Sequence, residues 1–152
     1  MYTKINEKDS AMKLGAIYSK EKTTFTLFSP VADSVFVIFY DKGNDSAETG
    51  RLEMVRGEGE LRSIFSATAE GNLDGVYYTY EVHTSDGTFS SHDPYARACG
   101  VNGHRSMVID LSKTNPDGFA DEDRPKLADP MSMVITEVSI VDVSAGASAH
   151  SM

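Results

Sequence analysis

The pattern that most limits what this chain can fold into is a two-residue alternation over residues 76–83, with no helical spacing elsewhere to compete with it. Successive side chains of a strand point to opposite faces, so such a run is typical of a strand in a sheet. Its two faces are Val76, Tyr78, Tyr80 and Val82 against Tyr77, Thr79, Glu81 and His83. No segment longer than ten residues has the i, i+3, i+4, i+7 spacing of an amphipathic helix, which predicts an all-β fold.

Shorter β-prone segments surround this strand, and turn residues separate them. Residues 35–40 are apolar on both faces, which indicates a central strand. Asp86-Gly87 favours a tight hairpin after 76–83. About seven short strands at this spacing are typical of an immunoglobulin-like β-sandwich. The other predicted strands are 23–29, 52–55, 61–67, 88–90 and 107–110.

The composition along the chain predicts four parts. Residues 1–13 form a polar N-terminal extension, 14–112 the sandwich, and 113–130 a charged, proline-punctuated linker. Residues 131–152 hold one extra strand at 133–143, followed by a flexible tail of small residues. A chain of 152 residues is too short for a barrel enzyme of about 250 residues.

The charge and the reactive side chains exclude several function classes. A net charge of −9 without a basic block disfavours nucleic acid and anionic membranes as partners. The N-terminus lacks the apolar run of a signal peptide or membrane span, which leaves a cytoplasmic protein or a secreted one whose signal has been removed. The single cysteine, Cys99, is expected to be packed and inert. The histidines lack metal-ligand spacing, so neither a metal nor a cofactor is expected.

Several sequence blocks resemble the carbohydrate-binding module family 48 domain that precedes the catalytic barrel in type I pullulanases. The resemblance spans roughly residues 14–118 and implies a β-sandwich, an α-glucan of the starch, glycogen or pullulan type as ligand, and a catalytic domain as partner. The blocks that carry it are Phe25-Thr26-Leu27-Phe28-Ser29-Pro30, residues 73–82, Asp93-Pro94-Tyr95-Ala96-Arg97-Ala98 and residues 100–111.

Residues 134–144 resemble the first barrel strand of glycoside hydrolase family 13. Ile135, Glu137, Asp142 and Ser144 match that pattern. The positions that depart from it are Thr136, Ser139, Val141 and Val143. In that family the catalytic carboxylates lie much further along the barrel, so no catalytic residue is assigned here. The chain is therefore predicted not to be an enzyme by itself, and the resemblance implies a parent α-1,6-glucosidase whose catalytic domain it lacks.

Two sets of residues are assigned to binding. Glucan recognition needs aromatic rings against the apolar sugar faces, and in the absence of tryptophan it is assigned to Tyr77, Phe89 and Tyr40. Docking on the catalytic domain is assigned to the turn that follows residue 92, in which proline fixes the backbone and aspartate bonds local amides. The docking residues are Asp93, Pro94, Tyr95 and Arg97.

The first hypothesis is an accessory module that stabilises a debranching catalytic domain and orients glucan toward it. A stand-alone glucan-binding or regulatory module is the second. The third is a self-associating domain, because the β-prone run 133–143 can pair with a free sheet edge of its own sandwich or swap into a neighbour.

Overall fold

The computed structural model describes residues 13–123 and 126–139, which divide into two compact units. The first unit ends at Asn115 and the second begins at Pro116. The first unit is built from two antiparallel sheets, so the predicted all-β sandwich is confirmed. No described helix is long and apolar enough to cross a membrane.

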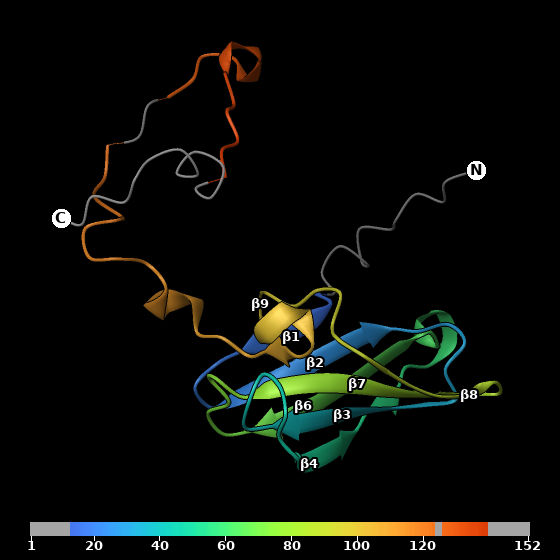
Figure 1. Cartoon of the computed structure of the whole chain (residues 1–152). Helices are drawn as coiled ribbons and strands as arrows, with labels where there is room; N and C mark the ends of the chain where they lie inside the picture. Colours follow the sequence, from blue (N-terminus) through green and yellow to red (C-terminus); the bar gives the residue numbers. More distant parts are fainter. Residues whose placement is uncertain (1–12, 124–125, 140–152) are drawn as a thin grey trace. The chain divides into compact units, whose positions relative to one another are not determined.

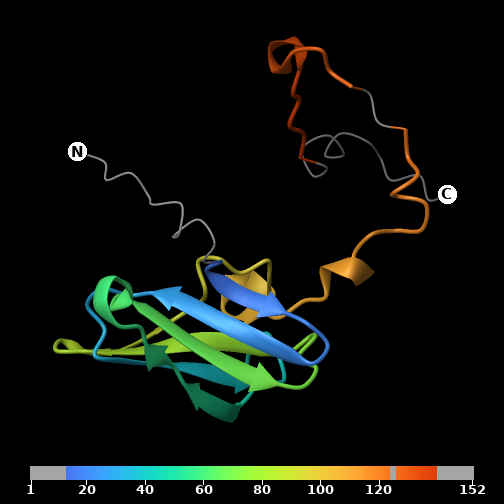
Figure 2. The ribbon, with the colours of Figure 1, turned by 180° about the vertical axis from the view of Figure 1, so that it is seen from behind.

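The two sheets lie face to face, with β2 and β6 behind β3 and β7 in Figure 1 and in front of them in Figure 2. One sheet has the order β1 (Gly15–Tyr18), β2 (Lys22–Phe28), β6 (Ile64–Glu70), β5 (Val55–Arg56). The other has the order β4 (Glu48–Glu53), β3 (Ser34–Tyr40), β7 (Tyr77–Thr84), β10 (Ser106–Met107), β9 (Ala98–Cys99), and β8 (Gly87–Ser91) also pairs with β7.

The predicted strands agree best where the pattern is longest. The strands β2, β3, β7 and β8 begin and end within one residue of the prediction. The segment predicted at 52–55 spans the end of β4 and the start of β5, and the one at 61–67 starts late because residues 59–61 form the 3-10 turn η2. The short strands β1 and β9 were not predicted, since four and two residues carry too little periodicity.

The inner faces of both sheets form one apolar core. The ring centroids of Phe25 on β2 and Tyr78 on β7 lie 5.0 Å apart in an edge arrangement. Tyr78 and Tyr80 are both buried, as the alternation predicts. The pairing of Val37 with Tyr80 sets the β3–β7 register and places Tyr40 opposite Tyr77 on the outer face.

A buried carboxylate closes one side of this core. Asp93 is 2% exposed, and its Oδ2 accepts hydrogen bonds from the hydroxyls of Tyr78 at 2.7 Å and Tyr80 at 3.2 Å. Its Oδ1 accepts from the Tyr95 amide, and its own amide donates to Ser106 Oγ, both at 2.8 Å. Burial raises the pKa of both tyrosines well above the ordinary value, and the charge of Asp93 raises it further, so both hydroxyls remain donors.

The second unit departs from the sequence prediction. Residues 133–139 form no strand, and the described part of this unit contains hydrogen-bonded turns over residues 117–121 and the short 3-10 turn η5 (Pro130–Ser132) but no strand. Val134 and Ile135 are 92% and 80% exposed. A strand needs a partner edge for its backbone groups, so β-propensity alone does not form one. The rest of the predicted strand, the tail and residues 1–12 lie outside the described residues.

Replacing Asp93 with alanine is expected to lower the free energy of unfolding by about 3 kcal/mol, because two buried tyrosine hydroxyls lose their acceptor. Asp93→Asn keeps an acceptor oxygen and should cost less. Urea unfolding followed by circular dichroism measures both, with exposed Asp41→Ala as the matched control. A loss for Asp93→Ala no larger than that of the control would contradict the role of this network.

Candidate functional site

The outer face of the β3–β7 pair carries two neighbouring aromatic residues. Tyr40 and Tyr77 are directly opposed across the strands, and both are half-buried. The Tyr40 hydroxyl lies 3.2 Å from Thr79 Oγ1, which belongs to the next outward side chain after Tyr77 along β7. The structure therefore brings together two of the three residues assigned to glucan binding.

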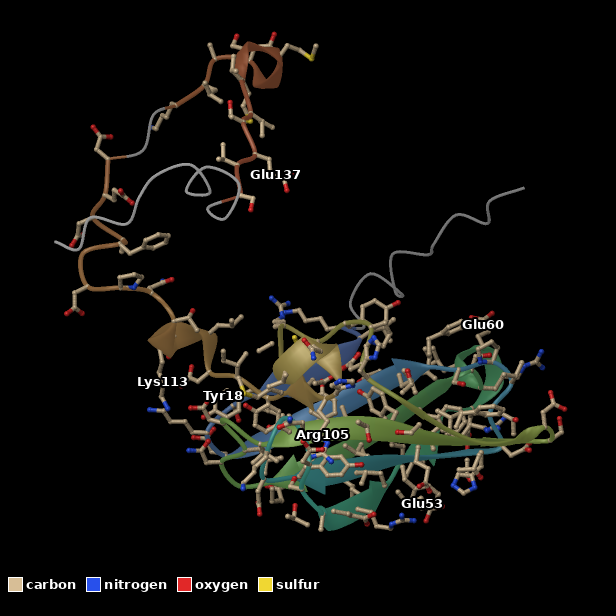
Figure 3. All side chains as sticks on the ribbon, viewed as in Figure 1. Tyr18, Glu53, Glu60, Arg105, Lys113 and Glu137 are labelled. Atoms are coloured by element: carbon tan, nitrogen blue, oxygen red, sulfur yellow. The ribbon has the colours of Figure 1, made fainter. Side chains whose placement is uncertain are left out.

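Arg105 lies over the Tyr40 ring and was not singled out from the sequence. Its guanidinium carbon lies 3.5 Å from the centroid of the Tyr40 ring, a close cation–π contact. The same guanidinium donates to the carbonyl of Lys42 at 2.7 Å, and to the hydroxyl and carbonyl of Ser46 at 2.8 and 2.9 Å. Figure 3 shows Arg105 over the second sheet. It ties the 41–47 loop to the sheet, and we call this arrangement the strap.

A contact between two glycines fixes the strap from the other side. A methyl group built on Gly100 would lie 2.5 Å from the Gly43 Cα, so the two backbones touch where no side chain fits. A methyl group on Gly43 would lie 3.1 Å from Tyr77 Cε1, which shows that the loop also packs on that ring. The spacing of residues in the sequence gives no signal for this contact, because Gly43 and Gly100 are far apart in the sequence.

Phe89 is separated from the tyrosine pair. It lies on the edge strand β8 and pairs with Val82 of β7. Because Val82 and Tyr77 point to opposite faces of β7, Phe89 projects on the side of the sheet opposite to Tyr77. Its side chain is 54% exposed. The three predicted aromatics do not form one platform, and the Tyr40 ring already carries the guanidinium of Arg105 on one face.

The residues assigned to docking lie on a turn beside β1. Asp93 is bound inside the sandwich and cannot reach a partner, although it bonds the Tyr95 amide as expected for this turn. Pro94 and Arg97 are exposed, and Tyr95 is 50% exposed. A methyl group on Gly15, which has a φ of +88°, would lie 2.8 Å from Tyr95 Cβ. The turn is therefore held against the start of β1.

A groove of about 360 Å³ lies between β1 and the segment 107–112. Ile17 and Tyr18 line one wall, and residues 107–112 line the other. Arg97 also lines the groove and brings a positive charge to it. The residue types around Arg97 indicated docking, but the groove was not predicted, because β1 is too short to be recognised from the sequence.

The chain leaves the first unit beside this groove through a fixed turn. Lys113 Nζ lies 2.6 Å from Asp74 Oδ2, and the amide of Asp110 donates to Asp74 Oδ1 at 2.8 Å. The hydrogen bond from Lys113 holds the pKa of Asp74 below its ordinary value, and the same bond raises the pKa of Lys113. Figure 3 shows Lys113 near Tyr18 at this end of the sandwich. We call the Asp74–Lys113–Asp110 contacts the exit latch.

The expectation that Cys99 is packed in the interior was wrong. Cys99 is exposed, because it lies on the two-residue strand β9 rather than in the core.

The sequence of residues 13–96 matches the family described as Carbohydrate-binding module 48 (Isoamylase N-terminal domain). The match covers more than half of the chain, and the observed sandwich agrees with it. The chain belongs to this family.

Its relatives are pullulanases. It is 31% identical to pullulanase A of Streptococcus pneumoniae (strain TIGR4) over 116 residues, which are 72% of this chain and 9% of that protein. The pullulanase of Paenibacillus barengoltzii, crystallised with maltohexaose and α-cyclodextrin, superposes with a TM-score of 0.71 at 35% identity. The superposition covers 78% of this chain and 18% of that one. The pullulanase of Bacillus acidopullulyticus gives 0.71 at 34%, over 78% and 14% of the two chains. The chain thus spans less than a fifth of the length of these relatives.

Arg105→Ala is expected to release the 41–47 loop, because the guanidinium donates three hydrogen bonds to Lys42 and Ser46 of this loop. Hydrogen exchange of the loop amides should accelerate at least tenfold, and the free energy of unfolding should fall by about 3 kcal/mol, because three hydrogen bonds from a charged donor and a cation–π contact are lost. Arg62→Ala, at an exposed arginine with no described side-chain hydrogen bond, is the matched control. Unchanged exchange in the loop of Arg105→Ala would mean that the glycine contact alone fixes it.

Proposed function

We propose that this chain is a non-catalytic accessory module of a pullulanase-type debranching enzyme and acts mainly through contacts with the catalytic domain. The observation that carries the proposal is the strap: Arg105 occupies a face of Tyr40, and Gly43 packs on Tyr77. Sugar recognition needs free aromatic faces, and here they are used to hold a loop. The family membership and the pullulanase relatives support the wider assignment.

A second candidate function is direct binding of α-glucan. It is favoured by the juxtaposition of Tyr40 and Tyr77 on adjacent strands. The Paenibacillus barengoltzii relative was crystallised with maltohexaose and α-cyclodextrin, which adds support for glucan as the ligand class. In this alternative the strap would have to open to admit the sugar.

Calorimetric titration with maltoheptaose and with a branched oligosaccharide from pullulan separates the two candidates. If the module is protein-facing, no heat of binding is expected at millimolar sugar, because Arg105 occupies one face of Tyr40 and the 41–47 loop packs on Tyr77. Micromolar affinity that is lost in Tyr77→Ala and kept in Phe89→Ala would instead establish a glucan site on the outer face.

The accessory role is tested in an exchange with the Paenibacillus barengoltzii pullulanase. This chain replaces the matching segment of that enzyme, and the thermal unfolding of the exchanged enzyme is compared with that of the enzyme lacking the segment. The exchanged enzyme is expected to unfold at least 5 °C higher, because domain contacts add to stability. Equal unfolding temperatures would refute the accessory role.

A further inference from the structure

We infer that the catalytic domain docks on the groove between β1 and the segment 107–112. This inference rests on the proposed function and adds to it the surface that makes the contact. The docking face, as we define it, consists of Ile17, Tyr95, Arg97, Met107, Ile109 and Leu111.

The docking face gathers apolar side chains that elsewhere on a protein surface would be scattered. Ile17, Tyr95 and Leu111 are 36%, 50% and 45% exposed. Met107 and Ile109 are partly buried and line the wall between them. Apolar groups collected around a groove mark a protein–protein contact more often than they mark a polar ligand.

The course of the chain identifies the occupant. Residues 109–112 line the groove, and the next residue, Lys113, is anchored by the exit latch. Polypeptide that follows the sandwich therefore starts at the rim of the groove. A domain that follows in the same polypeptide has a high effective concentration at this surface, and a second molecule in solution does not.

The charge at the groove gives the chemistry of the partner surface. The chain has a net charge of −9, yet the groove presents Arg97 and Lys13. Neither forms an ion pair with another described residue, and the Asp110 carboxylate is already bonded to the amide and hydroxyl of Ser112. The partner should therefore present apolar side chains and a carboxylate facing Arg97. A second copy is disfavoured because both copies carry the same large charge.

The test uses the exchanged enzyme with substitutions in the docking face. Leu111→Asp and Arg97→Glu should each lower its unfolding temperature by several degrees, because one places a charge in an apolar contact and the other reverses a complementary charge. The matched controls are Val55→Asp and Arg62→Glu, at exposed positions outside the groove. The same four substitutions in this chain alone should leave its unfolding temperature within about 2 °C of the unsubstituted value.

The outcomes distinguish this inference from the proposed function. If the exchanged enzyme gains no stability over the enzyme lacking the segment, the accessory role itself fails. If it gains stability and the docking-face variants retain all of it, only the position of the contact is wrong. A dimer of this chain that Leu111→Asp dissociates, or a rise in its unfolding temperature with maltoheptaose that the same change removes, would also overturn the assignment of the groove to the catalytic domain.

Discussion

The hydrogen bonds to the Asp93 carboxylate join parts of the sandwich that are distant in sequence, and the position of the turn beside β1 depends on them. They connect the turn after β8 with the core of β7 through Tyr78 and Tyr80. The Tyr95 amide and the Ser106 hydroxyl extend the network toward β1 and β10. A buried carboxylate is stable only when its oxygens are bonded, so the turn is held in one conformation. That conformation places Arg97 at the groove.

The same strand β7 therefore supports two different surfaces. Its inner side chains bind Asp93 and so fix the turn next to β1, while its outer side chains start with Tyr77 under the strap. Because the β3–β7 register is set by buried pairs such as Val37 and Tyr80, a shift by one residue would exchange the two faces. The apolar core thus determines which aromatics can meet a ligand.

The sequence predicted the elements whose signal is local. The alternation over 76–83 and the apolar run 35–40 gave the two central strands, and the Asp93-Pro94-Tyr95 turn was recognised from its residue types. It did not predict the strap or the groove, since Arg105 acts on residues about 60 positions away and β1 has only four residues. It overpredicted a strand at 133–139, because propensity reports suitability for a sheet and does not supply the neighbouring strand.

The energies involved favour the closed strap over an open aromatic platform. Opening it removes three hydrogen bonds from a charged donor and one cation–π contact, which together contribute on the order of 3 kcal/mol. A sugar ring that stacks on Tyr40 in place of Arg105 has to offset this loss before it gains affinity. A glucan that binds this face must gain additional contacts elsewhere, whereas a catalytic domain at the groove leaves the strap undisturbed.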